Sequence, residues 1–318
     1  MYFGPQTWRT LKVQLTRREN APSSAQTFRK RSGGLGRLRQ ILKPWRKVVL
    51  AFSGGVDSTF LLSVLCEDPA REVLAVTARS QTYPQSQAEE ARRLARLFPK
   101  VRHREIETDE LSLAGFRNNP PDRCYLCKKE LFSTLEAIRQ EEGFDVVLDG
   151  SNLDDLGDYR PGRRALQELG ARSPLLEAGL GKKAIRRLSR ARGLPTWNKP
   201  SFACLSSRFP YGTPITEEAL ARLDRCEAFL SKKFHGPIRV RFHGAVARIE
   251  LDPSLFPACL KARGSIVSYF RKQGFSYVTL DLAGYRTGSM NEVLPQARKG
   301  SAAESIGARG TQTTRGQA

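Results

Sequence analysis

The sequence has few cysteines and no long apolar run. Its six cysteines in 318 residues are too few and too unevenly spaced for a disulfide framework. The longest uninterrupted apolar run, from Val48 to Phe52, is far shorter than the ~20 residues that a membrane-spanning helix needs. The first residues also lack the apolar core of a secretory signal. We therefore expect a soluble protein of the reducing cytoplasm, where thiols remain available for metal binding or for chemistry.

Acidic residues are scarce relative to basic ones, and the imbalance is concentrated in the tails. The chain holds 53 Lys and Arg against 32 Asp and Glu, a net charge of +21. Residues 1–46 contribute +10 and residues 296–318 contribute +3, which leaves +8 for the rest. Charge confined to tails is a weak indication of a nucleic-acid partner. We expect a basic, disordered extension at 1–44, whose Arg-rich composition would also suit an organellar transit peptide, and a disordered tail at 296–318.

The order of apolar segments predicts a parallel sheet in the first half of the chain. Apolar runs typical of strands alternate with segments that have helical spacing. Such alternation is typical of a doubly wound α/β fold, whose ligands bind beyond the carboxyl ends of the strands. We expect strands at 47–53, 72–78, 101–106 and 145–149, and helices at 58–66, 87–98, 122–142 and 182–192.

A smaller α+β domain is expected after this sheet. A stretch rich in proline and glycine, from Gly193 to Pro214, indicates a boundary or hinge. We place the first domain at 45–198 and the second at 199–295. The second domain is expected to contain a helix at 216–234, strands at 238–242 and 246–251, a helix at 253–272 and a strand at 277–282.

The segment Ser53-Gly54-Gly55-Val56-Asp57-Ser58 lies between a predicted strand and a predicted helix. Its glycines let backbone N–H groups close around an oxyanion, its serines add hydroxyl donors, and the helix N-terminus adds a favourable dipole. The Gly-Lys-Ser/Thr of a Walker loop is absent. The segment therefore predicts a phosphate site of another kind. A plain glycine turn, capped by Asp57 and Ser58, is the structural alternative.

Acidic and small residues follow the fourth predicted strand. Asp149-Gly150-Ser151-Asn152 comes first, and Asp154, Asp155 and Asp158 follow closely. Carboxylates this close together repel one another unless Mg²⁺ or basic groups compensate them. The cluster indicates the nucleotide side of the same pocket. For any single residue, a solvated turn with Asp154 as a helix cap is the alternative.

Two cysteines, Cys124 and Cys127, lie three residues apart near the start of a predicted helix, so both sulfurs fall on one helical face. A structural zinc site needs four ligands, yet a second Cys-x-x-Cys is absent and the three histidines stand alone in the sequence. Cys204, in the irregular segment, is the candidate for a third thiol beside the pocket. A redox pair or two packed thiols is the alternative. The remaining cysteines sit in apolar helical stretches and are expected to be packed thiols: Cys66, Cys226 and Cys259.

Taken together and in order, several segments resemble the LarE family of ATP-dependent sulfur transferases. The glycine segment is similar to the PP-loop of ATP pyrophosphatases, which split ATP between its α and β phosphates and adenylate a substrate oxygen. The resemblance covers about residues 40–295, and the tails lie outside it. The segments that carry it are Ser53 to Ser58, Asn119 to Lys128, Asp149 to Gly162, Pro200 to Arg208, Arg239 to Gly244 with Ala247 to Glu250, and Tyr285 to Asn291.

This resemblance implies a step in making the nickel-pincer nucleotide cofactor of lactate racemase. Members adenylate the carboxylates of pyridinium-3,5-biscarboxylic acid mononucleotide and replace each activated oxygen with sulfur. In one version of the family the cysteine that matches Cys204 gives up its own sulfur and becomes dehydroalanine. In the other, three cysteines hold a [4Fe–4S] cluster whose fourth iron can carry an extra sulfide. Cys124, Cys127 and Cys204 make this chain resemble the cluster version, so the implied cofactors are ATP, Mg²⁺ and that cluster.

The resemblance also implies roles for individual residues. Cys204 and Asp57 would be catalytic, with Asp57 assisting Mg²⁺ at the pyrophosphate. Arg239 and Arg241 alternate in a predicted strand and share one face, where they could bind the 5′-phosphate of the substrate; a solvated strand face is the alternative. The implied ATP-binding residues are Ser53, Gly54, Gly55, Asp57, Ser58, Thr77, Gly150 and Asn152. The implied substrate-binding residues are Ser207, Arg208, Glu227, Arg239 and Arg241.

Two other functions remain open at this point. A PP-loop tRNA thiolase would explain the positive charge better, but the sequence contains no recognisable RNA-binding module. A non-catalytic iron–sulfur carrier could use ATP for regulation alone. Under the sulfur-transferase interpretation we expect a homo-oligomer that binds the pyridinium dicarboxylate nucleotide, binds neither stable nucleic acid nor membrane, and hands its product to a nickel insertase.

Overall fold

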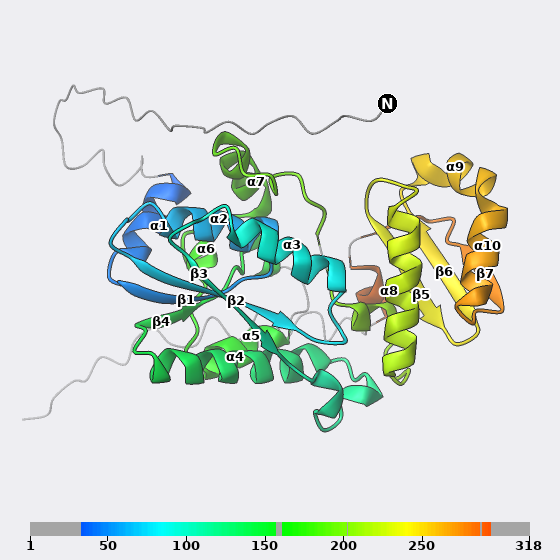
Figure 1. The fold of residues 1–318 in the computed structure, drawn as a ribbon, viewed down its shortest axis with the longest axis horizontal. Coiled ribbons are helices and arrows are strands. Elements are labelled where there is room, and N and C mark those ends of the chain that lie inside the picture. Colours follow the sequence, from blue (N-terminus) through cyan, green and yellow to red (C-terminus); the bar gives the residue numbers. More distant parts are fainter. Residues whose placement is uncertain (1–32, 157–160, 202, 287, 294–318) are drawn as a thin grey trace, which may run out of the picture. The chain divides into compact units, whose positions relative to one another are not determined.

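The computed structural model describes residues 33–156, 161–201, 203–286 and 288–293 (Figure 1). Residues 1–32 of the expected extension, the expected tail at 296–318, and Asp158 lie outside these ranges. Within the ranges, no helix is both long enough and apolar enough to cross a membrane.

A four-stranded parallel sheet is the centre of the first half of the chain. β1 (Lys47–Ala51) pairs with both β2 (Glu72–Arg79) and β4 (Val146–Leu148), and β3 (Arg102–Glu107) lies beyond β2. The strand order β3-β2-β1-β4 means that the chain reverses its direction of winding between β1 and β4. In an open parallel sheet, the loops on either side of such a point diverge and leave a crevice at the carboxyl ends of the strands. The predicted doubly wound α/β sheet is confirmed.

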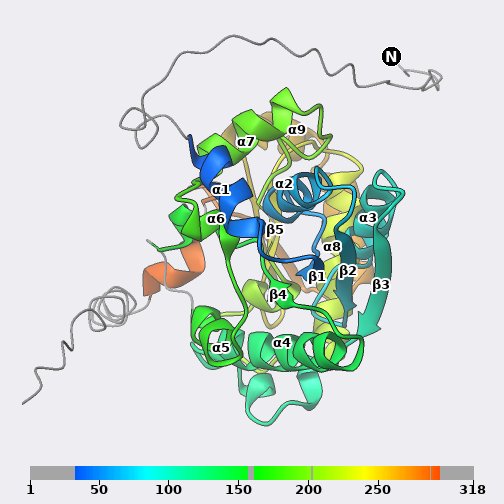
Figure 2. The same cartoon turned by 90° about the vertical axis from the view of Figure 1, so that its left-hand side faces the viewer.

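Helices cover both faces of this sheet because its strands carry apolar side chains on both faces. Val48 and Leu50 face one helical layer, and Val49 faces the other. Figures 1 and 2 show the two layers on opposite sides of the strands. The first layer consists of α1 (Gly34–Leu42), α2 (Val56–Leu65), α3 (Gln85–Ala95), α6 (Pro174–Glu177) and α7 (Lys182–Ala191); the second consists of α4 (Arg123–Glu141) and α5 (Gly162–Glu168).

The helix α1 corrects the expectation of a disordered extension at 1–44. Leu38 and Leu42 are fully buried, and both belong to the same apolar cluster as β1 and α2. Arg39 forms an ion pair with Glu67 at 2.7 Å. Residues 34–44 are therefore part of the fold, since their leucines recur at helical spacing between basic residues that point to solvent.

A second, smaller sheet follows, as predicted. β5 (Ile238–His243) and β6 (Val246–Leu251) form an antiparallel hairpin, and β7 (Tyr277–Leu280) pairs in parallel with β6. Its apolar face packs on α8 (Glu217–Ser231) and α10 (Arg263–Lys272). The single helix expected at 253–272 is wrong. The backbone leaves the helical region at Ala262 (φ −85°, ψ 3°), which separates α9 (Phe256–Lys261) from α10.

Candidate functional site

The predicted phosphate loop connects β1 to α2. Ser53 Oγ lies 3.2 Å from Ser58 Oγ and accepts a hydrogen bond from Gly55 N at 3.4 Å, so the two hydroxyl groups are on the inside of the loop. Gly54 has a φ of +64°, and a Cβ at this position would lie 2.9 Å from Ala91 Cα on α3. A side chain is therefore excluded at Gly54 on two separate grounds, backbone conformation and space.

Asp57, in the first turn of α2, forms an ion pair with Lys182 at the start of α7. Its other carboxylate oxygen, Oδ1, is buried and has no hydrogen-bond partner among the described residues. Burial raises the pKa of Asp57 above its usual value, while Lys182 acts in the opposite direction. A buried carboxylate oxygen without a partner is a costly arrangement in an isolated protein, and it suits a cation that arrives with a ligand.

The loop after β4 lies against the phosphate loop. A Cβ on Gly150 would approach Ser58 N to 3.2 Å, so only glycine leaves this amide accessible without displacement. Asn152 is buried, and its side-chain oxygen accepts a hydrogen bond from Asp154 N at 3.0 Å. Asp154 in turn accepts a hydrogen bond from Lys182 N at 2.8 Å. The acidic cluster thus fixes the start of α7, and with it the position of Lys182.

Thr77 is the one predicted ATP-binding residue whose hydroxyl is already engaged inside the sheet. It is buried in β2, donates a hydrogen bond to Phe52 O at 2.7 Å, and lies 3.0 Å from His103 Nε2. This hydroxyl ties the end of β1 to β2 and β3 and supports the phosphate loop from beneath.

A network of arginines holds the segment that carries Cys204. The guanidinium of Arg208 donates to the carbonyl oxygens of Ala203 at 2.7 Å and Cys204 at 3.0 Å. Its other edge forms a bidentate pair with Glu227 on α8, at 2.9 and 2.8 Å. Ser207 Oγ also donates to Cys204 O, at 2.7 Å. The backbone of Cys204 is thereby fixed from the second sheet and its helix.

Arg239 and Arg241 lie on β5, but their side chains have different partners. Arg241 forms a buried bidentate pair with Glu250 of β6, at 2.9 and 2.8 Å, and also donates to Ser207 O at 2.7 Å. Arg239 donates to the carbonyl oxygen of Ser201 at 2.9 Å, and no carboxylate in the described residues pairs with it. Burial lowers the pKa of Arg239, and the neighbouring Arg208 and Arg241 lower it further. Three guanidinium groups gather here, which favours an anion beside Arg239.

The three predicted sulfur ligands interact electrostatically. Burial raises the pKa of Cys127 well above its usual range, and the charges of Glu110, Cys204 and Cys124 raise it further. Cys127 also packs against the apolar cluster that contains Leu205. Among the residues that the structure describes, no group of three or more His, Cys, Asp or Glu is placed to hold a single metal ion. All six cysteines are free thiols, and Cys226 and Cys259 are buried as expected.

Backbone contacts explain how distant cysteines approach one another. The side-chain amide of Asn119, just before α4, donates a hydrogen bond to Pro210 O at 2.7 Å. The main-chain carbonyl oxygen of Asn119 accepts a hydrogen bond from Gly212 N at 3.0 Å. Asn119 adopts a left-handed conformation, with a φ of +52°. Leu205 N donates to Thr82 O at 2.8 Å, in the loop after β2. The segment around Cys204 is therefore tied both to the start of α4 and to the edge of the parallel sheet.

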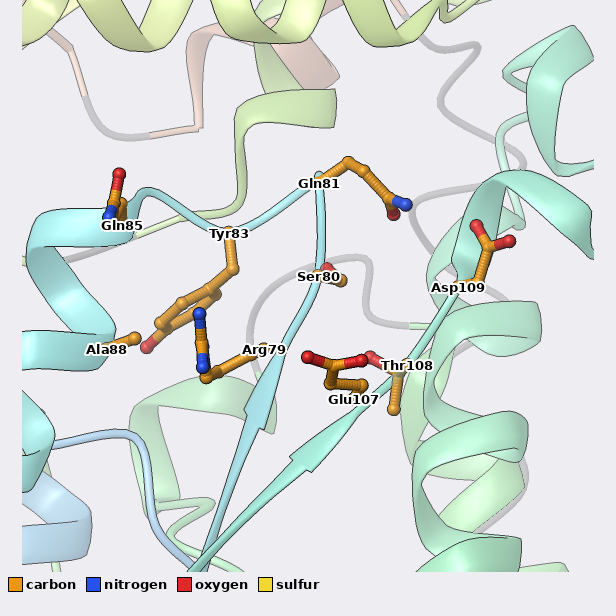
Figure 3. A pocket seen from close by; sticks show the side chains of 9 residues that line it. All are labelled: Arg79, Ser80, Gln81, Tyr83, Gln85, Ala88, Glu107, Thr108 and Asp109. Carbon is orange, nitrogen blue, oxygen red and sulfur yellow. The ribbon is translucent and has the colours of Figure 1, made fainter.

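Tyr83 connects the phosphate loop to Cys204. Its hydroxyl donates to Ser53 O at 3.2 Å. Burial raises the pKa of Tyr83, and the charge of the nearby Cys204 adds to this effect. Tyr83 also lines a cavity of about 540 Å³ at the carboxyl ends of β2 and β3 (Figure 3). The cavity is lined by Arg79, Ser80, Gln81, Tyr83, Gln85, Ala88, Glu107, Thr108 and Asp109, none of which the sequence indicated.

Sequence reasoning missed further residues that the structure places at the site. Lys182 contacts Asp57, and Lys199 Nζ donates to Gly54 O at 3.1 Å. Glu110 is a buried carboxylate that accepts hydrogen bonds from Thr108 at 2.9 Å and Thr82 at 3.3 Å. A lone lysine or glutamate carries no local signal of this kind. Only the position of Lys182 after Gly181, at the start of a basic helix, could have drawn attention to it.

Comparison with known proteins identifies the family. No protein-family model matches the chain. It is 39% identical over 259 residues to the pyridinium-3,5-bisthiocarboxylic acid mononucleotide synthase of Lactiplantibacillus plantarum, covering 81% of this chain and 93% of the synthase. The chain belongs to the LarE family. Two uncharacterized proteins match this chain over a similar length. The one from Synechocystis is 41% identical and covers 82% of this chain and 97% of its own length. The one from Methanocaldococcus jannaschii is 32% identical and covers 76% of this chain and 92% of its own length.

Proposed function

We propose that this chain is an ATP-dependent sulfur transferase of nickel-pincer nucleotide cofactor biosynthesis. It adenylates the carboxylates of pyridinium-3,5-biscarboxylic acid mononucleotide and converts them to thiocarboxylates, with release of AMP and pyrophosphate. The observation that carries the proposal is the match over 93% of the curated synthase. In this chain, the phosphate loop and the Cys204 segment are the two regions to which the chemistry is assigned. The geometry of these two regions supports each step.

Activation is assigned to the loop between β1 and α2. A carboxylate is a poor acyl donor, because expulsion of its oxygen as oxide is prohibitive, whereas an acyl adenylate expels AMP. A substrate oxygen attacks the α-phosphorus, the bond to the β-phosphate oxygen breaks, and pyrophosphate leaves. The loop N–H groups with Ser53 and Ser58 would hold the phosphates. The buried Oδ1 of Asp57, which has no partner in the described residues, suits Mg²⁺.

Substrate binding is assigned to the guanidinium groups near Cys204. Arg208 and Arg241 each have a carboxylate partner, Glu227 and Glu250, so their charges are already compensated. Arg239 has none among the described side chains and is therefore the group with the most to gain from a phosphate or carboxylate of the substrate. Arg208 and Arg241 instead hold the backbone around the cysteine, through the carbonyl oxygens of Cys204 and Ser207.

Sulfur delivery is assigned to Cys204, with Cys124 and Cys127. The three thiols are of the donor type that a [4Fe–4S] cluster takes, and the charges of Cys204 and Cys124 both act on Cys127, which supports this assignment. Cys124, Cys127 and Cys204 would hold such a cluster through three thiolates, and a fourth iron without a protein ligand could then supply the sulfur. Ser207 and Arg208 hold the Cys204 carbonyl, so that the thiol of Cys204 is presented at a fixed position.

The test is to incubate purified protein, prepared anaerobically, with ATP and the pyridinium dicarboxylate nucleotide and to follow product by mass. We expect a mass gain for replacement of oxygen by sulfur, together with AMP. Asp57→Asn should abolish AMP release while iron–sulfur absorption persists, and Cys124→Ala, Cys127→Ala and Cys204→Ala should each lose that absorption. An intact-mass deficit of about one H₂S at Cys204 after turnover would instead mean that the protein's own sulfur is consumed.

Two outcomes would replace this proposal. Sulfur found in tRNA alone, when tRNA is offered beside the pyridinium nucleotide, would indicate a tRNA thiolase. Absence of AMP and pyrophosphate with every substrate would indicate an iron–sulfur carrier. We also propose that the enzyme works in the cytoplasm as a homo-oligomer and passes its product to a nickel insertase. Size-exclusion chromatography with light scattering tests the assembly.

A further inference from the structure

Lys182 forms an ion pair with Asp57, the carboxylate that the proposed function assigns to Mg²⁺. Lys182 Nζ contacts Asp57 Oδ2, while Oδ1 is buried without a partner in the described chain. The side chains of Lys182 and Asp57 remain 29% and 19% exposed. The pair is therefore accessible to a ligand that enters the phosphate loop.

The backbone of Lys182, at the start of α7, is held in place by Asp154. Lys182 N donates to Asp154 Oδ2 at 2.8 Å, and a Cβ on Gly181 would lie only 2.8 Å from Asp154 Oδ1, so the backbone here is closely packed. The lysine side chain, in contrast, has four rotatable bonds and a single charged end. A fixed backbone with a flexible cation lets the ammonium move between nearby anions without movement of the helix.

We propose that Lys182 is a mobile counter-ion: it neutralises Asp57 in the absence of nucleotide and transfers to the β- and γ-phosphates when Mg²⁺–ATP binds. This inference rests on the proposed function and adds a phosphate-binding residue to it. Transfer leaves both oxygens of Asp57 available to the magnesium ion. It also places a positive charge on the pyrophosphate, which is the leaving group of adenylation. Lys182 thus favours the triphosphate over AMP.

The arrangement explains why an acidic residue can be kept at the phosphate loop of an empty enzyme. Without a counter-ion, the partly buried Asp57 would carry a poorly compensated charge and repel the incoming phosphates. Arg186, one turn further along α7, also acts favourably on the charge of Asp57. Its guanidinium is held by the carbonyl oxygens of Trp197 at 3.0 Å and Lys199 at 2.7 Å, so it is not available to make the same movement.

Nucleotide binding separates this role from a structural one. We compare α,β-methylene-ATP, which resists cleavage between the α and β phosphates, with AMP by titration calorimetry. Lys182→Met should weaken binding of the analogue roughly tenfold to a hundredfold and leave AMP affinity unchanged, because a charge-assisted hydrogen bond is lost only with the longer ligand. Lys182→Arg should retain most of the affinity. Lys183→Met is the matched control, since Lys183 is the adjacent, exposed lysine on α7.

Metal binding gives a second readout that does not depend on activity. In nucleotide-free protein, Lys182→Met should bind Mn²⁺ more tightly than wild type, because Asp57 is no longer paired. Adding Asp57→Asn should remove this gain. Equal losses for AMP and the analogue in Lys182→Met, or unchanged binding of both, would overturn the role of Lys182 while leaving the proposed function intact. If the wild-type chain bound neither nucleotide, both proposals would fail together.

Discussion

Replacement of Glu227 by Gln tests whether the arginine network around Cys204 contributes to folding as the geometry requires. The Arg208 side chain is 0% exposed and that of Glu227 is 12% exposed, and they meet through two hydrogen bonds. Glu227 also accepts a hydrogen bond from Val240 N at 2.8 Å. The substitution keeps the shape of the side chain but leaves the guanidinium charge buried without its carboxylate.

Removing one partner of a buried ion pair typically costs about 3–5 kcal/mol. Arg208 retains three other acceptors, namely the carbonyl oxygens of Ala203 and Cys204 and the hydroxyl of Ser207, so we expect the lower end, about 3 kcal/mol. For a chain of this size, that corresponds to a fall in Tm of roughly 6–12 °C. The control is Glu292→Gln, whose bidentate partner Arg286 is 41% exposed. Its cost should be much smaller, because solvent screens an exposed ion pair.

Urea unfolding of both variants, followed by circular dichroism, measures the two costs. A double-mutant cycle with Arg208→Met then isolates the pair. We expect Glu227→Gln to cost much less in the Arg208→Met background, because no buried charge is left behind. A cost for Glu227→Gln no larger than that of Glu292→Gln, or strict additivity in the cycle, would refute the reasoning.

Three further predictions concern the loop, the thiols and pH. Gly54→Ala should abolish ATP binding in a titration, because the added Cβ would lie 2.9 Å from Ala91 Cα in a left-handed conformation. Burial raises the pKa of Cys226 to about 12, so in cluster-free protein at pH 8 iodoacetamide should label the exposed Cys124 and spare Cys226, as peptide mass mapping would show. Burial lowers the pKa of His103, so the unfolded chain takes up its proton first and stability falls as pH drops below about 6.5. His103→Gln should reduce that fall in urea midpoints.

Local patterns allowed much of the fold to be predicted. The β5–β6 hairpin was predicted closely because apolar and polar residue types alternate along its strands, as Ile238, Val240 and Phe242 do in β5. β1 and β4 were recognisable as short apolar runs between turn residues. The helix α1 was missed because Arg37 and Arg39 dominate its composition, although Leu38 and Leu42 carry the apolar stripe. The Arg-rich composition of residues 1–44 led to a prediction of disorder for the whole segment, although Gly34–Leu42 form a helix.

The site was predictable only where its chemistry is local in sequence. Ser53 to Ser58 form one loop, so their spacing alone predicts their function. The partner of Asp57 is 125 residues away, and a lysine in a basic helix gives no sign of it. Arg239 and Arg241 share a strand face, and the register places Glu250 directly opposite Arg239, yet of the two arginines Glu250 pairs with Arg241, its diagonal neighbour. Which arginine keeps an unengaged charge depends on how the side chains pack across the hairpin, and neither the spacing within one strand nor the strand register reveals that.

Contacts of α7 connect the phosphate loop, where adenylation is proposed, with the segment that leads to Cys204, where sulfur transfer is proposed. Arg186, one turn after Lys182, holds the carbonyl oxygens of Trp197 and Lys199. Lys199 donates a hydrogen bond to Gly54 O in the phosphate loop and also forms an ion pair with Glu90 on α3, at 2.7 Å. Cys204 follows five residues later. The loop that would bind the pyrophosphate and the segment that leads to the sulfur therefore share the same supports, so any shift of the loop on nucleotide binding acts directly on the approach to Cys204.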